Sequence, residues 1–225
     1  MRHSYPTEVA VIAVWYHCIL SGGSVPIDTE FACRILASQM RVLKDSGLLA
    51  EADDFHVGVN GTHEDAEIIR LLSPCSKVDI REHGPKATTE IPTLKWLQDW
   101  LPEHPDWFVL YHHCKGVTKP HDEFTQHHRH VMEKAVITNW PTCVADLERG
   151  YDAVGVNLVH PIKRPVLPGR FFAGNFWWAR ANYLLKLPKL PATCSWANRC
   201  MAEGWVCSGP GEPKFMDYER PQLYQ

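Results

Sequence analysis

The stretch DWFVLYHHCKG, at residues 106–116, joins an unbroken apolar run to a cluster of polar and charged residues. The apolar part, residues 107–111, is rich in aromatic side chains, and a bounded run of this length is typical of a strand buried on both faces. Such strands lie inside parallel or mixed sheets, and open α/β sheets bind ligands beyond the carboxyl ends of their strands. The sequence therefore predicts that His112, His113 and Lys115 lie where a sheet presents chemistry.

Length and composition indicate one ordinary soluble domain. The chain has 225 residues, of which 45% are hydrophobic and 22% charged, and its formal net charge of −3 at pH 7 is mild. A chain of this length can bury a substantial core. The charge balance does not mark a strongly basic nucleic-acid binder, although a local basic groove would not show in the sum.

The cysteines and the first apolar run predict the compartment. Eight cysteines are scattered along the chain without the paired spacing of a zinc site. No secretory signal precedes them, because the apolar run at residues 9–20 is too short to span a bilayer and lacks a small-residue cleavage site. We therefore expect reduced, mostly buried thiols in a cytoplasmic protein.

Alternating strand and helix patterns predict an α/β fold with a mostly parallel sheet. Strand patterns occur at residues 9–16, 55–59, 78–80, 107–113, 151–158, 171–179 and 205–207. Helical patterns follow the first three strands, with these candidate N-caps: Asp28 or Thr29, Thr62, and Thr88 or Thr89. Further helices are expected at residues 132–147, with a kink or restart at Pro141, and at 180–187 and 195–203.

His113 and Lys115 are the first candidate site residues. Side chains alternate along a strand, so His112 and His113 cannot both face one ligand. Lys115 follows a buried strand and precedes a glycine, where an ammonium could meet a phosphate. The alternative is that these side chains only pack and form hydrogen bonds. A solvated helix face is predicted for the later histidines, His127, His128 and His130.

Three further polar residues are candidates. Gly174 lies within a strand pattern, where glycine often marks the close approach of a ligand, and Asn175 beside it offers a donor and an acceptor to hydroxyl groups. The alternative is a core strand whose aromatic residues only pack. Glu90 is either a site carboxylate or a cap that faces the helix dipole. Glu203, at the end of the last predicted helix, could act as a general base on a hydroxyl, although surface glutamates are common.

Five segments, taken together and in this order, resemble a family of glycosyltransferases with the nucleotide-diphospho-sugar (GT-A-like) fold. The family pattern runs E-x-P-T-L, a strand that closes in H-T-K-G, then Y-D-x-x-G-x-N, and G-N-F-W-W-A followed by L-P. This chain has EIPTL at residues 90–94, HHCKG at 112–116, YDAVGVN at 151–157, GNFWWA at 174–179 and LP at 187–188. The likeness covers more than half of the chain, and Cys114 replaces the threonine of the family pattern.

The resemblance implies a single glycosyltransferase-like domain over residues 1–225. Its fold would be a Rossmann-like mixed, mostly parallel sheet flanked by helices. Residues 1–80 would form the nucleotide-binding half, residues 81–207 the donor-sugar and acceptor half, and residues 208–225 a tail. The family occurs in bacteria and viruses, so the compartment would be the cytoplasm of a bacterium or of a virus-infected host cell.

The resemblance also implies roles for individual residues. A nucleotide-sugar, with UDP as its nucleotide, would meet a donor side formed by Trp15, Tyr16, His17, Asn60, Glu90, Thr93 and Lys115. The sugar and acceptor would meet Asn175, Trp177 and Trp178. Lys115 would neutralise the leaving diphosphate, with His113 as a second catalytic residue. Glu203 would be the base if the reaction inverts the anomeric centre, whereas a retaining enzyme would not need it.

The need for a divalent metal divides into two alternatives. Many transferases of this fold hold Mn²⁺ or Mg²⁺ with a D-x-D motif, and no such motif follows the strand that ends near Tyr111. Either His113 helps to ligate a metal, or Lys115 neutralises the diphosphate without one. The second is favoured because these cations prefer carboxylate oxygens.

The acceptor and the class of function also stay open. The acceptor could be a glycan or a hydroxylated nucleobase in phage-type modified DNA, and the absence of a basic run argues mildly against DNA. A protein of another class, a non-catalytic lectin-like or nucleotide-binding module, could have kept the same fold, and a zinc-binding structural protein is a third alternative. Donor sugar, stereochemistry and oligomeric state are not encoded in any pattern that we find.

Overall fold

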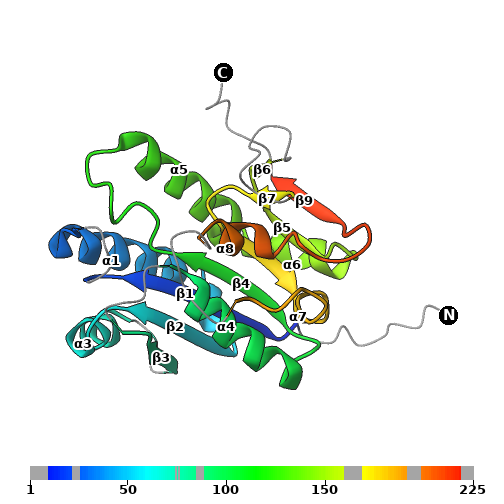
Figure 1. Ribbon diagram of the computed structural model, residues 1–225, viewed down its shortest axis with the longest axis horizontal. Coiled ribbons are helices and arrows are strands. Elements are labelled where there is room, and N and C mark those ends of the chain that lie inside the picture. Colours follow the sequence, from blue (N-terminus) through cyan, green and yellow to red (C-terminus); the bar gives the residue numbers. More distant parts are fainter. Residues whose placement is uncertain are drawn as a thin grey trace.

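The computed structural model describes residues 10–21, 26–73, 75, 77–84, 89–159, 169–191 and 199–218. In these ranges seven strands form one sheet in the order β3-β2-β1-β4-β8-β5-β9 (Figure 1). Its strands are β1 (Ile12–Ile19), β2 (Asp54–Asn60), β3 (Val78–Glu82), β4 (Phe108–His113), β5 (Ala153–Val156), β8 (Trp177–Arg180) and β9 (Phe215–Tyr218). A two-stranded sheet pairs β6 (Leu158–Val159) with β7 (Phe171–Phe172).

The large sheet is mixed and mostly parallel. Strands β3, β2, β1 and β4 run parallel to one another, β8 lies antiparallel between β4 and β5, and β9 pairs parallel with β5. Strand β1 is buried along nearly its whole length, as a central strand covered on both faces must be. The predicted α/β class, with a mixed, mostly parallel sheet flanked by helices, is confirmed.

Helices cover both faces of the sheet. They are α1 (Thr29–Asp45), α2 (Leu48–Glu51), α3 (His63–Leu72), α4 (Ile91–Trp100), α5 (Glu123–Glu133), α6 (Trp140–Glu148), α7 (Ala181–Leu184) and α8 (Arg199–Trp205). A 3-10 turn (Leu101–Glu103) follows α4, and a π-helix (Lys134–Thr138) joins α5 to α6. In the part of the chain that the structure describes, every helix is too short or too polar to span a bilayer.

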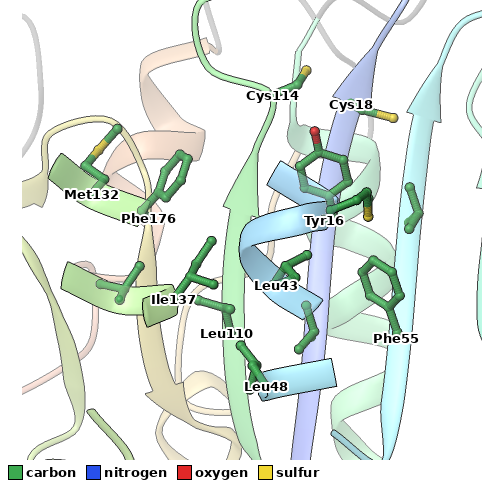
Figure 2. Packing of buried hydrophobic residues seen from close by; sticks show 14 of the residues in the cluster. Tyr16, Cys18, Leu43, Leu48, Phe55, Leu110, Cys114, Met132, Ile137 and Phe176 are labelled. Carbon is green, nitrogen blue, oxygen red and sulfur yellow. The ribbon is translucent and has the colours of Figure 1, made fainter. Parts of the chain in front are cut away.

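The alternation of side chains along the strands creates two cores. Tyr16 and Leu110 point to the face covered by α1, α3, α5 and α6, where Figure 2 shows them with Leu43 and Met132. Trp15, like Val109 and Tyr111 of β4, points to the opposite face, under α4, α7 and α8. In Figure 1 helix α4 lies in front of the strands. Consecutive residues of one strand therefore serve different cores.

Local sequence signals set the starts of the helices. The Asp28 carboxylate accepts from Phe31 N at 3.0 Å and caps α1. Thr62 caps α3 in a capping box with Asp65. Helix α6 begins at Trp140 with proline in its first turn, which confirms the predicted restart.

Several predicted boundaries were wrong. The strand patterns at residues 151–158 and 171–179 each break into two strands, because Asn157 (φ 59°) and Gly174 with Asn175 (φ 100° and 57°) adopt left-handed backbone conformations. Helix α8 runs on to Trp205, so the strand predicted at 205–207 does not form. The predicted tail, residues 208–225, contains β9. Part of the last predicted helix, residues 195–198, lies outside the described residues.

Candidate functional site

The carboxyl ends of β1, β2 and β4 meet at one edge of the sheet. The register pairs His17 with His113 and Ile19 with Asn60, and Cys114 N donates to His17 O at 3.0 Å. Three side chains that the sequence assigned to a site therefore end on adjacent strands, at the edge where open α/β sheets bind ligands.

Glu90 lies at the centre of a polar cluster on this edge. It occupies the N-cap position of α4, yet its side chain makes no capping hydrogen bond. Instead its Oε2 accepts from Tyr111 Oη at 3.0 Å and from Asn175 Nδ2 at 2.5 Å. Burial, and then the nearby Glu90 charge, raise the pKa of Tyr111 well above its usual value, so the phenol stays protonated and donates. The capping role of the Glu90 carboxylate is therefore wrong.

His113 faces the second oxygen of this carboxylate. Its Nδ1 lies 3.6 Å from Glu90 Oε1, and its Nε2 lies 2.8 Å from Gly174 O. A carbonyl oxygen only accepts, so Nε2 carries a hydrogen and donates. The side chains of His113 and Glu90 are 15% and 17% exposed, which leaves both within reach of a small ligand.

Asn175 is fixed by two hydrogen bonds of opposite sense. Trp177 Nε1 donates to its Oδ1 at 2.7 Å, while its Nδ2 donates to Glu90. The residue is fully buried and has a φ of 57°, a left-handed conformation that asparagine tolerates better than most residues. The carboxamide thus presents one defined face to the carboxylate.

Lys115 packs beside the same turn. A Cβ on Gly174, which has a φ of 100°, would lie 3.4 Å from Lys115 Cε and 2.5 Å from Met132 Sδ, so only glycine fits at this point. Burial, followed by the charge of Lys115, lowers the pKa of His128 to about 4. Lys115 therefore lies between the turn at Gly174 and a neutral imidazole on α5.

A second hydrogen-bonded group adjoins the cluster. Thr93 Oγ1 lies 2.8 Å from His17 Nδ1 and 3.0 Å from His83 Nε2, so the hydroxyl bridges two imidazoles. Burial is the main reason why the pKa of each is lowered, for His83 to about 4 and for His17 well below its usual value with the charges of His113 and His83 adding to it. Both rings are neutral at pH 7. Gly58 makes room for the bridge, because a Cβ there would lie 2.0 Å from Thr93 Oγ1.

The structure puts four predicted binding residues in the core. Trp15 stacks on His56 with ring centroids 4.2 Å apart, and Trp177 stacks on Tyr111 at 5.2 Å. All four rings, those of Trp15, Tyr16, Trp177 and Trp178, are fully buried. They present no surface for a base or a sugar, because strand alternation directs Trp15 and Trp177 into one core and Tyr16 and Trp178 into the other.

Asn60 and Glu203 lie on two further elements, β2 and α8. Asn60 is 1% exposed, and its Nδ2 donates to Thr89 O at 2.9 Å, which ties β2 to the start of α4. Glu203 is half-buried on α8, a helix that packs against β7 and α4. Among the predicted site residues, direct side-chain contacts therefore join Glu90 to His113 and to Asn175, with Trp177 hydrogen-bonded to Asn175, and separately join His17 to Thr93.

Comparison with known families identifies the family to which the chain belongs. A family model described as "Domain of unknown function (DUF8361)" matches residues 24–210, well over half of the chain. The chain belongs to this family. No curated protein matches it.

Two solved structures resemble this DUF8361 member at a distance. The 4-diphosphocytidyl-2C-methyl-D-erythritol synthase of Anaerococcus prevotii DSM 20548 is 12% identical, with a TM-score of 0.43 over 96% of this chain and 91% of that chain. A second crystal structure of a synthase with this name is 13% identical, with a TM-score of 0.46 and the same coverage of 96% and 91%. Likenesses this distant assign no activity to the DUF8361 chain.

The described residues contain no ready-made cluster of metal ligands. Among them, no three His, Cys, Asp or Glu side chains are placed to hold an ion. His113, the tentative metal ligand, has its Nε2 on Gly174 O and its Nδ1 toward Glu90. We derive no step through a metal at this site.

Sequence reasoning missed several polar residues of this DUF8361 chain. Tyr111 shares a strand face with His113, two positions on, so strand alternation could have placed it in the cluster. His128 was predicted on a solvated face, but it is 4% exposed and its Nε2 lies 2.8 Å from Asn157 Nδ2. The signal was its spacing, because Met132 and the π-helix follow on the same stripe. Nothing local marks His83, which joins the bridge only through tertiary contact with Thr93.

Proposed function

We propose that this chain is a glycosyltransferase that moves a sugar from a nucleotide-sugar, with UDP as the nucleotide, to an acceptor hydroxyl. One observation carries the proposal: three motifs that are far apart in sequence converge in one cluster. Glu90 of EIPTL accepts from Asn175 of GNFWWA, and His113 of HHCKG donates to Gly174 of the same turn. Because these residues are far apart in sequence, local structure alone does not bring them into one polar cluster.

The cluster supplies charges of the signs that the reaction needs. Transfer breaks the bond between the anomeric carbon and the diphosphate oxygen, which leaves with the electron pair, and forms a bond from that carbon to the acceptor oxygen. Lys115 neutralises the charge that gathers on the diphosphate, and the Glu90 carboxylate stabilises the positive charge on the sugar. The acceptor proton passes to Glu203 if the reaction inverts the anomeric centre.

The two halves of the chain would bind different parts of the donor. The nucleotide would lie over the half formed by residues 1–80, where His17 and Asn60 reach the edge, and the sugar would lie over the half formed by residues 81–207, beside Glu90, Thr93 and Asn175. The acceptor would be a glycan or a hydroxylated nucleobase in DNA. We keep both, because no residue of the cluster distinguishes these two acceptors.

Ligand-induced thermal stabilisation tests this proposal. Wild type, Lys115→Met and Lys119→Met are melted with a panel of nucleotide-sugars at millimolar concentration, once with Mn²⁺ and once with EDTA. Lys119 is the matched control, because it lies in the same loop with its side chain 62% exposed and pairs with Asp122 at 3.8 Å. A donor at a hundred times its Kd stabilises the folded state by about 2.7 kcal/mol.

We expect one donor class to raise the Tm of wild type and of Lys119→Met, and to raise that of Lys115→Met far less. Turnover of that donor should follow the same order. The absence of any shift in wild type with every donor in both buffers would overturn the proposal. An equal shift in Lys115→Met would remove Lys115 from the site. Stabilisation by glycans alone would point to a lectin-like module instead.

A further inference from the structure

The backbone that carries Lys115 is held by side chains from the opposite face of the sheet. Gln39 of α1 donates from Nε2 to His113 O at 3.2 Å, and Arg129 of α5 donates from Nη1 to Lys115 O at 3.1 Å. Gln126 of α5 donates to Gly116 O at 3.3 Å. Three backbone carbonyls of the loop at residues 113–116 thus accept from side-chain donors of two helices.

The donors belong to a buried polar network. Gln39 is fully buried, Arg129 is 4% exposed and Glu133 is 2% exposed. Tyr16 Oη donates to Gln39 Oε1 at 2.7 Å, and the Gln39 side chain lies close enough to Glu133 to lower the pKa of its carboxyl against the larger effect of burial. Arg129 Nε lies 3.2 Å from Glu133 Oε1, an ion pair without hydrogen-bond geometry. The network runs from β1 through α1 and α5 to the loop, and His130 borders it with its Nδ1 3.1 Å from Glu133 Oε2.

Stability does not explain why charges are buried here. A buried ion pair contributes about as much as well-packed apolar residues of the same volume, or less, because both ions lose their hydration. Helix α5 already has an apolar anchor in Met132, which is fully buried in the core shown in Figure 2. Burial raises the pKa of Glu133 against the opposing charge of Arg129, which is the mark of this desolvation.

The loop itself is shaped to receive the donors. Gly116 has a φ of 94°, and a Cβ on it would lie 2.9 Å from Gln126 Nε2 and 3.4 Å from Arg129 Nη1. A side chain at this position would therefore push the Gln126 donor away from the Gly116 carbonyl and crowd Arg129. Cys114 Sγ also accepts from Ile19 N at 3.2 Å, which fastens the loop to the end of β1.

We propose that the Tyr16–Gln39–Glu133–Arg129 network is a positioning device that fixes the backbone of residues 113–116 and thereby aims Lys115 at its anion. The aim toward an anion rests on the proposed function, whereas the fixing of the backbone does not. Arg129 and Gln39 are positioning residues, since they touch the loop carbonyls and act on a ligand only through Lys115.

A double substitution separates this role from stability. Arg129→Met with Glu133→Met removes both buried charges at similar volume. The control is Arg34→Met with Glu30→Met, an ion pair of the same i,i+4 spacing on α1 whose side chains are 61% and 83% exposed. Three quantities are measured for each protein: the Tm, the hydrogen-exchange rates of the Lys115 and Val117 amides, which donate to His113 O and Cys114 O, and the affinity for inorganic pyrophosphate.

We expect the double variant to melt within a few degrees of wild type while its Lys115 and Val117 amides exchange about tenfold faster or more, because the loop opens locally. Its affinity for pyrophosphate should fall by at least about tenfold, a difference of about 1.4 kcal/mol. The control pair should change neither quantity. Unchanged loop exchange in a folded double variant would overturn the proposal.

A second variant covers the case in which the double variant does not fold. Gln39→Met removes the donor to His113 O and leaves the ion pair in place, and it should also speed exchange at Lys115. Unchanged exchange in folded Gln39→Met would overturn the proposal as well. If wild type does not bind pyrophosphate but the variants speed exchange as expected, the network fixes the loop and the proposed function fails instead.

Discussion

At the carboxyl edge of the sheet, the direction in which a side chain points decides the role of its residue. Glu90 sits where a helix cap is expected, but its carboxylate turns away from the helix to Tyr111 and Asn175. His113 faces this cluster, while its neighbour His112 is fully buried on the other face of β4 against Tyr16. Position along the chain predicted His113 and Lys115 as site candidates, because the end of an apolar run shows where a buried strand ends. It could not predict where Glu90 turns, which depends on residues 21 and 85 positions away.

The neighbouring tryptophans of β8 give a test at this scale. Trp177 Nε1 donates to Asn175 Oδ1, whereas Trp178 Nε1 donates to Val136 O in the π-helix at 2.7 Å. Replacement of either by phenylalanine leaves a buried acceptor unpaired, which costs about 1–3 kcal/mol of unfolding free energy. Only Trp177→Phe also releases the carboxamide that is oriented toward Glu90.

We therefore expect Trp177→Phe and Trp178→Phe to lower the urea midpoint to a similar extent, but only Trp177→Phe to weaken nucleotide-sugar binding, by roughly tenfold. Urea denaturation and a calorimetric titration of each variant check this. Equal loss of affinity in both would contradict the role of Trp177 in orienting Asn175 toward Glu90.

Helices and strands were predicted well where an apolar pattern or an N-cap residue decides the structure. They were predicted poorly where the backbone turns. The buried strands β1, β2 and β4 and the capped helices α1 and α3 follow directly from apolar runs and N-cap residues. The patterns at residues 151–158 and 171–179 looked continuous because their side chains are apolar, but left-handed asparagines break both. Strand β9 was missed because its four residues are only half-buried, form the outermost strand of the sheet and follow a Gly/Pro-rich stretch that is typical of a tail.

Across the whole molecule, buried histidines set how the fold responds to acid. Burial lowers the pKa of His83 and His128 to about 4 and that of His112 to about 3, from an ordinary value of 6.5. In the described part of the chain neither ring nitrogen of His112 has a hydrogen-bond partner. Below about pH 6.5 the unfolded chain binds protons that the folded chain refuses, so the free energy of unfolding falls as the pH falls from 6.5 toward 4.

His112→Leu should reduce this acid sensitivity. Each histidine that stays neutral in the fold contributes a slope of at most about 1.4 kcal/mol per pH unit in this window. The variant removes one such group, so its unfolding free energy should fall less steeply than that of wild type in urea titrations at several pH values. Exposed His121 supplies the control, since His121→Leu removes no buried imidazole. If the unfolding free energy of His112→Leu depends on pH as steeply as that of wild type, His112 is not a group that stays neutral in the folded state.

The most direct test of the central claim, that a nucleotide-sugar binds at the carboxyl edge of β1 and β4, is a map of backbone amide chemical shifts. Labelled protein is titrated with the donor that stabilises it most, and the amides that move are assigned. The account predicts that the largest changes fall on His17, Glu90, Lys115, Gly174 and Asn175. Changes confined to the groove between α1 and α3, beside Met40 and Leu72, with the edge residues unmoved, would contradict it.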